Sequence, residues 1–261
     1  MSMTTNKPHP FALEPWLTVP FENRLKTPID KLVDILLSLP GGLALGDEIS
    51  NHGSGSLSCI ETRLYKYAQD VISQLDCWHQ RYCAEVVEPN GQIRTFLSQS
   101  IKERLGVSDL RFVCPQGRAY RDGHTAVFIA MYDAANLLAF SLLSLVSPPT
   151  DQCNHRMQFH AQSILSANYF MESNGSTAPA GGYVLMAFPL KIAGLWGPLQ
   201  EQRDHAIRKL QNWDREGGSR NICRFAAPVF LESSTTVALS SVYHANVAAK
   251  VRLKQNSLHV L

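Results

Sequence analysis

The sequence predicts an all-α protein, an irregular array of helices without a β-sheet. Apolar residues recur at intervals of three and four over 57–82, and residues 126–146 form an apolar run of helical length. Such spacing places the apolar side chains on one face of a helix. No alternation of strands with helices and no internal repeat is evident, which argues against α/β and repeat architectures. We therefore expect a single all-helical domain over residues 23–250.

The N-terminal region predicts a tail followed by a first helix. Residues 1–22 contain prolines and no apolar segment of the signal-peptide kind, so we expect an extended tail. Thr27 and Pro28 then indicate a helix start, because threonine caps free amides and proline suits the first helical position. We expect this helix over 28–39, ended by Pro40 and the two glycines after it.

The next segments predict a connection, a long amphipathic helix and a wrapping segment. Residues 46–58 are rich in glycine and serine, which is typical of a flexible connection. The segment 86–117 starts with a turn, and we expect a short helix near 95–105 within it. The apolar stripe of the amphipathic helix comprises Leu57, Ile60, Leu64, Ala68, Val71, Leu75, Trp78 and Tyr82.

The run 126–146 is nearly long and apolar enough to span a membrane. A spanning helix would place Asp133 in lipid, which costs about 2.5–3.5 kcal/mol or more. At 100° per residue its polar side chains share an arc of roughly 80°. A single polar stripe is typical of a central helix in a bundle, so we expect a core helix and no membrane. The stripe consists of Asp122, Asp133, Asn136, Ser144 and Ser147.

The rest of the chain, after the apolar run, predicts helices, a link and a tail. A short breaker predicts an antiparallel helix over 151–172, and 174–183 reads as a glycine-rich link. Two further helices meet at Gly197-Pro198, and Gly217-Gly218 ends the second of them. Residues 219–250 indicate no definite state, and 251–261 form a tail. The expected buried residues are Met157, Ala161, Ile164, Ala167 and Phe170 on the antiparallel helix, and Leu199, Ile207, Leu210 and Trp213 on the last helix.

The net charge and the positions of the cysteines limit the classes of function that we expect for this chain. The net charge is +2, and the 18% of charged residues lies below the usual share of about 25%, so no strong field favours nucleic acid or membrane. The basic residues of the last helix alternate with acidic ones, as on a solvated face. These basic residues are Arg203, Arg208, Lys209 and Arg215. The six cysteines (59, 77, 83, 114, 153 and 223) are scattered, which favours reduced intracellular thiols.

Two short stretches contain metal-ligand residue types. CWHQRYC places Cys77, His79 and Cys83 close together, and CNHRMQFH does the same for Cys153, His155 and His160. Zinc needs about four convergent ligands, and Cys77 and His79 point about 160° apart on a helix. We interpret these residues as small buried thiols beside surface imidazoles, and we assign no metal ligand.

A third group, in and after YRDGHTA, allows two interpretations. Asp122, His124 and Asp133 would supply an acid or base if they faced a pocket. In the simpler interpretation Asp122 begins a helix and Asp133 pairs with a neighbouring arginine or amide. The chain contains no Gly-x-Ser-x-Gly elbow, phosphate loop or dinucleotide fingerprint. We therefore assign no catalytic or cofactor-binding residue and expect no enzyme.

A family resemblance covers residues 118–225. The run RAYRDGHTAVFIAMYDAANLLAFSLL is followed by SILSANYFMES, FPLKIAGLW, GPLQEQRDHAIRKLQNWDREGG and NICRF. This order resembles the C-terminal half of the regulatory domain in fungal zinc-cluster transcription factors. The resemblance implies an all-α regulatory domain that is commonly nuclear and often controls secondary-metabolite genes.

The zinc cluster that reads DNA in that family has no counterpart here, since no cysteine precedes Cys59. We therefore expect a nuclear transcription regulator that lacks its own DNA reader and acts through a protein partner. Two alternatives stay open: an enzyme or small-molecule binder of a biosynthetic pathway with the same helical shell, and a helical adaptor that uses an exposed apolar groove. The alternative location is the cytoplasm.

Overall fold

A computed structural model describes residues 13–51, 57–86, 120, 122–147, 150–173 and 180–215. Within these ranges the chain forms α-helices, one short 3-10 helix and no strand, which confirms the predicted all-α class. The elements are α1 (Glu14–Thr18), η3 (Val19–Phe21), α2 (Pro28–Asn51), α3 (Leu57–Val86), α5 (Gly123–Val146), α6 (Asp151–Ser173), α7 (Ala180–Trp196) and α8 (Gln200–Arg215).

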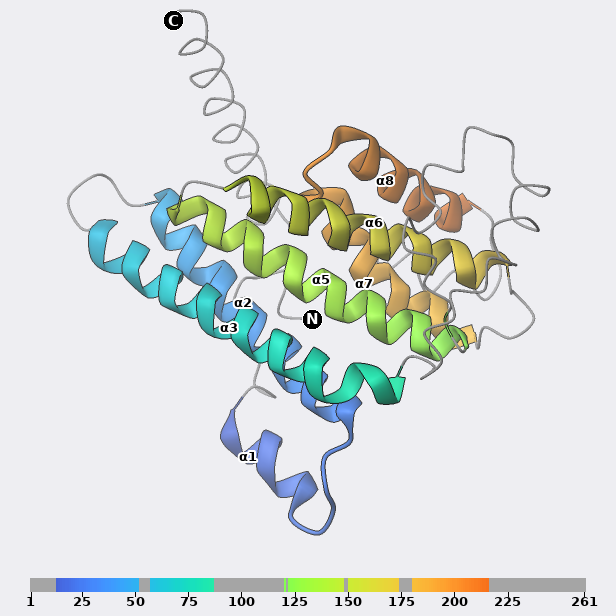
Figure 1. The fold of residues 1–261 in the computed structure, drawn as a ribbon, viewed down its shortest axis with the longest axis horizontal. Coiled ribbons are helices and arrows are strands. Elements are labelled where there is room, and N and C mark those ends of the chain that lie inside the picture. The colour runs from blue at the N-terminus through green and yellow to red at the C-terminus, as the bar shows by residue number, and fades with distance from the viewer. Residues whose placement is uncertain are drawn as a thin grey trace, which may run out of the picture.

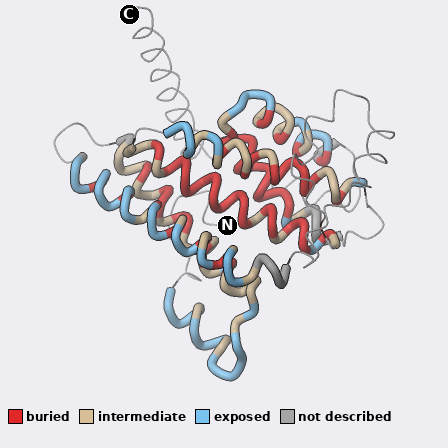
Figure 2. The backbone as a smooth tube through the Cα atoms, viewed as in Figure 1, coloured by how far each residue is buried: buried red, intermediate tan, exposed pale blue. Residues whose placement is uncertain are grey.

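Helix α5 lies at the centre of the array (Figure 1). It packs against α2, α3, α6 and α7, while α8 lies on α7 and α6. By length and composition α5 is apolar enough to cross a membrane, and 83% of its most apolar window is buried inside the protein. Figure 2 shows this contrast, with α5 buried along most of its length and α3 exposed on its outer side. Burial in the core therefore accounts for the apolar composition of α5.

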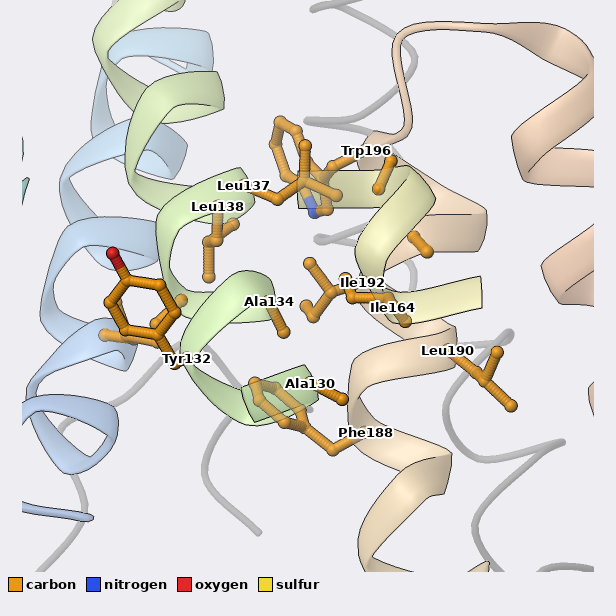
Figure 3. Close-up of a cluster of buried hydrophobic side chains, with 14 of the residues drawn as sticks. Ala130, Tyr132, Ala134, Leu137, Leu138, Ile164, Phe188, Leu190, Ile192 and Trp196 are labelled. Carbon is orange, nitrogen blue, oxygen red and sulfur yellow. The ribbon is translucent and has the colours of Figure 1, made fainter. Parts of the chain in front are cut away.

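The core is contiguous across the central helices. In Figure 3, Leu137 of α5 lies near Trp196 of α7, and Leu138 of α5 and Ile164 of α6 belong to the same core cluster. All four side chains are at most 1% exposed. Each buried side chain of this size contributes about 1.5–3 kcal/mol relative to its exposed state. Packing around α5 is therefore what holds the neighbouring helices in place.

The predicted start of α2 is confirmed, whereas the extended tail before it is wrong in part. The Thr27 amide donates to Asp30 Oδ2 at 2.9 Å, and the Asp30 amide donates to Thr27 Oγ1 at 3.2 Å. These reciprocal bonds satisfy two amides that a helix start leaves free. Residues 14–21 form α1 and η3 instead of extended chain.

The predicted end of the first helix is wrong, because α2 continues through Pro40 to Asn51. Proline removes one backbone hydrogen bond, but Pro40 is buried and Leu39 and Leu43 beside it are at most 1% exposed. Gly42 is a contact point with other helices, since a Cβ there would collide with the Tyr67 ring and Leu142. Tertiary packing therefore overrides the local stop signals, and residues 46–51 are helical instead of a flexible connection.

The amphipathic stripe of α3 is confirmed over its described side chains. Five of its residues are at most 3% exposed, namely Leu64, Ala68, Val71, Leu75 and Trp78. Trp78 Nε1 also donates to Pro28 O at 2.7 Å, which ties α3 to the start of α2. Tyr82 is half-buried at the end of the stripe, where Lys31 Nζ donates to its hydroxyl at 2.5 Å.

Helices α5 and α6 are antiparallel, as predicted. His160 contacts Asp133, while Cys153, earlier on α6, lies 3.8 Å from Ser144, later on α5. The polar stripe of α5 therefore faces α6. The buried face of α6 is also confirmed at Met157, Ala161, Ile164 and Ala167, and Phe170 is half-buried. The link expected over 174–183 is shorter than predicted, because α7 begins at Ala180.

The two helices predicted to meet at Gly197-Pro198 are α7 and α8. The Arg203 amide donates to Leu199 O at 3.2 Å, so Leu199 caps α8 and Pro198 precedes the helix instead of occupying its first turn. Leu210 and Trp213 are buried as predicted, at 2% exposure each. Leu199 is 45% exposed and Ile207 is half-buried, so burial was overstated at both positions.

The buried face of α8 is completed by residues that were not predicted, Gln202 and Ala206, at 3% and 0% exposure. Several predictions lie outside the described residues. They are the short helix near 95–105, the helix end at Gly217-Gly218, the segment 219–250 and the tail 251–261.

Candidate functional site

A hollow of about 310 Å³ lies where α3, α5 and α6 meet. We call it the imidazole hollow, because three histidines take part in its lining. Its residues are Asp76 and His79 of α3, Tyr132 of α5, and His155, Arg156, Phe159 and His160 of α6. Three separate stretches of sequence therefore converge on one surface depression.

A buried carboxylate lies behind the hollow. His160 Nδ1 is 2.8 Å from Asp133 Oδ1, and the two residues are 4% and 0% exposed. With an ionised carboxylate as partner, Nδ1 carries the hydrogen and donates it, as in other carboxylate–histidine pairs. Since His160 lines the hollow, its Nε2 is the ring nitrogen left for a molecule there.

Aromatic rings on three sides hold the His160 imidazole in one orientation. Phe140 stacks against it with ring centroids 6.1 Å apart at 18°, and Phe159 meets it edge-on at 5.3 Å. Tyr132 approaches in a T-shaped arrangement at 6.1 Å. Together with the bond to Asp133, these contacts preorganise a single polar atom in an aromatic wall.

Tyr132 lies between α3 and the imidazole pair. Its ring stacks with Trp78 and with His79, both at a centroid distance of 5.3 Å. Burial, together with the negative charges of Asp133 and Asp76, raises the pKa of Tyr132 above its usual range. The Tyr132 phenol therefore stays protonated at neutral pH and is no general base.

The rim of the hollow carries an ion pair. Arg156 Nη2 lies 3.0 Å from Asp76 Oδ1, and their side chains are 37% and 40% exposed. The Arg156 guanidinium also lies 4.5 Å from the centroid of the Phe140 ring, a cation–π arrangement. Exposed ion pairs contribute about 0–1 kcal/mol to stability, so a ligand can exchange partners with this one at little cost.

The three residues predicted as a possible acid–base group do not gather in one pocket. Asp122 caps α5, where its Oδ1 accepts from the Thr125 amide at 2.8 Å, and His124 is exposed on the first turn. Asp133 lies three turns further, about 16 Å along the helix axis. The simpler interpretation is confirmed for Asp122, and His160 is a partner of Asp133 that was not predicted.

The interpretation of the metal-like stretches needs correction in two places. Cys77 is exposed instead of buried, and Cys153 is half-buried. His160 is buried instead of lying at the surface. Over the described ranges, no group of three or more histidine, cysteine or acidic residues lies close enough to hold a metal ion. The side chain of Cys83 lies outside the described residues.

Sequence reasoning missed His160, although a signal for it existed. The predicted buried stripe of α6 included Met157 and Ile164, and His160 stands three residues after the first and four before the second. Helical periodicity alone therefore places this imidazole on the buried face. A buried imidazole needs a polar partner, and Asp133 on the neighbouring helix supplies it.

No strong nucleophile lies at the hollow. The side chains around it that the structure describes include no serine, threonine or cysteine. Cys77, next to Asp76 in the sequence, is exposed and is not among the lining residues. Burial raises the pKa of Cys153, two residues before His155, which keeps that thiol protonated and unreactive. The arrangement can therefore bind a molecule, hydrogen-bond it and exchange a proton with it.

A larger hollow, of about 700 Å³, lies at the N-terminal end between α1, η3 and α2. Its two charged residues on the α2 side are engaged with each other, since Lys26 Nζ lies 2.5 Å from Asp34 Oδ2. Helix α1, which forms one wall, projects away from the array (Figure 1). Among its described lining residues no charged group is buried as Asp133 and His160 are behind the imidazole hollow, so it is the weaker candidate despite its size.

Comparisons with known proteins add no assignment. A scan against protein-family models finds no matching family, and searches of curated proteins and of solved structures find no match. The functional argument therefore depends on the geometry of the imidazole hollow and on the resemblance described above.

Proposed function

We propose that the protein is a ligand-responsive helical regulator of transcription that acts in the nucleus through a DNA-binding protein partner. The observation that carries the proposal is the Asp133–His160 pair, buried at 0% and 4% exposure beside the imidazole hollow. Burying a polar pair costs free energy, and simple packing would be served as well by apolar residues. A pair that also presents a nitrogen to a hollow is explained by binding.

The regulatory part of the proposal comes from the resemblance over residues 118–225. The resemblance over residues 118–225 includes no zinc cluster, so the proposal assigns the reading of DNA to a partner. The cytoplasm is the alternative location if the partner carries the protein into the nucleus on demand.

A reporter experiment tests this function. The whole chain is fused to an unrelated DNA-binding domain, and expression of a reporter gene under its operator is measured in fungal cells. We expect the fusion to change expression, and we expect His160→Gln to alter that change by at least threefold. His124→Gln, an exposed histidine outside the hollow, is the matched control and should behave as the unmodified chain.

If the fusion leaves reporter expression unchanged in every form, the regulatory proposal is wrong. Deleting the gene offers an independent check in the native organism. Lower transcript levels of a set of neighbouring genes support regulation, whereas unchanged transcripts with one missing metabolite contradict it.

An enzyme is the second candidate, and the same pair favours it. An imidazole oriented by a buried carboxylate can act as a general base on a bound hydroxyl or water. Under this function Asp133→Asn should abolish turnover while the circular dichroism spectrum stays unchanged. Under the regulatory function the same variant changes the ligand response, and no turnover exists to lose.

A further inference from the structure

We infer that the ligand of the imidazole hollow is a flat aromatic molecule that carries an acidic oxygen, either a phenol or an aryl carboxylic acid. The inference rests on the proposed ligand-binding function and names the class of ligand. Three properties of the hollow lead to it: the hydrogen-bonding atom that His160 presents, the size and aromatic character of the walls, and the balance of charge around them.

The acidic oxygen follows from the Asp133–His160 pair. Asp133 Oδ1, 2.8 Å from Nδ1, leaves Nε2 as the nitrogen for the ligand. A neutral imidazole accepts through Nε2, and an imidazolium donates through it. An acidic hydroxyl or carboxyl group can form a hydrogen bond with Nε2 in both states of the imidazole. Its O–H donates to the neutral ring, and its oxyanion accepts from the imidazolium. An ammonium group can only donate and an ether can only accept, so each fails in one of the two states.

The aromatic ring follows from the walls. A cavity of about 150 Å³ lined by apolar side chains holds one benzene molecule. The imidazole hollow, at about 310 Å³, therefore has room for a substituted ring or two fused rings. Tyr132, Phe159 and His79 contribute rings to its lining, and aromatic pairs gain about 0.5–1.5 kcal/mol beyond the area they bury.

The charge balance disfavours a cationic ligand. Asp76 and Arg156 neutralise each other across 3.0 Å at the rim. The remaining titratable groups of the lining are three histidines and Tyr132, and the histidines add positive charge when they bind protons. The Asp133 carboxylate behind the wall lies 2.8 Å from His160 Nδ1, so the imidazole stands between its negative charge and the hollow. Arg156 is available to an oxyanion, since its ion pair is half-exposed and weak. A neutral or anionic ligand is therefore accepted more readily than an amine.

Equilibrium dialysis with matched probes tests the inference on the full chain. The probes are 4-nitrophenol, 4-nitrobenzoate, 4-nitroanisole and 4-nitrobenzylamine, which share the ring and differ in the substituent. We expect the phenol or the benzoate to bind at least tenfold more tightly than the anisole and the benzylamine. The yellow absorbance of the nitrophenolate then reports whether the bound phenol is ionised.

Two variants locate the binding. His160→Gln should weaken the tighter probe at least tenfold, while His124→Gln leaves it unchanged. Arg156→Gln changes a half-exposed residue and should lower the affinity for 4-nitrobenzoate by about threefold to tenfold. This variant replaces His160→Gln as the test if His160→Gln does not fold. Equal affinities for the phenol, the benzoate and the anisole, or tighter binding of the benzylamine, would overturn the inference. So would an unchanged affinity in both variants.

The outcome separates this inference from the proposed function. Tighter binding of the benzylamine or the anisole, lost in His160→Gln, overturns the ligand class and leaves the binding function standing. Tight binding of an acidic probe by a chain that never alters the reporter supports the ligand class and overturns the regulatory function.

Discussion

We call the region where α7 and α8 meet at Gly197-Pro198 and pack against each other the α7–α8 joint. Helices meet both there and at the imidazole hollow, but the polar side chains have different partners in the two regions. At the joint, Arg203 Nη1 donates to Gly197 O at 2.6 Å, and Lys209 Nζ lies 2.7 Å from Glu172 Oε2. Each of these groups serves the backbone or a neighbouring helix. At the hollow, His160 uses Nδ1 for Asp133, and its second nitrogen stays available to a ligand.

A stretch that stands out in the sequence is therefore not necessarily the functional site. The stretch FPLKIAGLWGPLQEQRDHAIRKLQNWDREGG carries much of the family resemblance, but its described part is a structural joint in which most of the apolar residues are buried. The hollow is assembled from residues that are unremarkable one by one. The following predictions, from the largest expected effect to the smallest, test whether the two regions differ as described.

Truncation of a buried side chain should lower the free energy of unfolding more at the joint than at the imidazole hollow. Trp213 is 2% exposed on α8, so Trp213→Ala should lower the free energy of unfolding by about 3–5 kcal/mol. Urea denaturation measures the change. Leu199→Ala, at a 45% exposed position next to the same joint, should change stability by less than about 0.5 kcal/mol. A similar loss in both variants would mean that α8 does not pack as described.

The buried lysine of the joint should destabilise the folded protein, whereas the charged groups of the imidazole hollow are paired. Burial of Lys191 on α7 lowers its pKa from 10.5 to about 7. Between these pH values the unfolded chain binds more protons than the folded chain, so stability rises with pH from about 7 towards 10.5. Lys191→Met should remove this slope and raise stability at neutral pH, by on the order of a few kcal/mol.

Chemical denaturation at a series of pH values measures the effect of Lys191. The unmodified chain and Lys191→Met should converge as the pH approaches 10, where the lysine is neutral in the folded state. Parallel curves for the two proteins over this range would show that Lys191 keeps its proton in the folded protein.

The paired carboxylate of the hollow should matter less for stability than the packing of the joint. Asp133→Asn retains the shape of the side chain but replaces the charge-assisted bond to His160, so stability should fall by about 1–3 kcal/mol. Thermal unfolding measures this change, and dialysis with 4-nitrophenol should show at least a tenfold loss of affinity. Unchanged affinity in a folded variant would separate Asp133 from the ligand.

The rim should have the smallest effect on stability. Arg156 and Asp76 are each more than a third exposed, so Arg156→Gln should change the free energy of unfolding by less than about 1 kcal/mol. Its affinity for 4-nitrobenzoate should nevertheless fall. Arg156 would then affect binding and leave stability nearly unchanged. Trp213 at the joint would affect stability and leave binding unchanged, and this contrast distinguishes the two regions.

Local signals predicted the helices where short-range interactions decide the structure. Thr27 and Asp30 form their reciprocal cap, and Asp122 caps α5, because these bonds span only three residues. The stripes of α3 and α6 were predicted because burial on one face repeats with the helical period. In the same way, the single polar stripe of α5 indicated that a partner helix lies along it.

Tertiary structure alone decided the rest, since these outcomes depend on residues that are distant in sequence. Pro40 and Gly42 look like a stop, but the helix continues because Tyr67 and Leu142 pack closely against it. Asp133 and His160 lie on different helices, and neither helix by itself shows that the two side chains pair. Only the antiparallel packing of α5 on α6 brings them within 2.8 Å and creates the pair on which the proposed function depends.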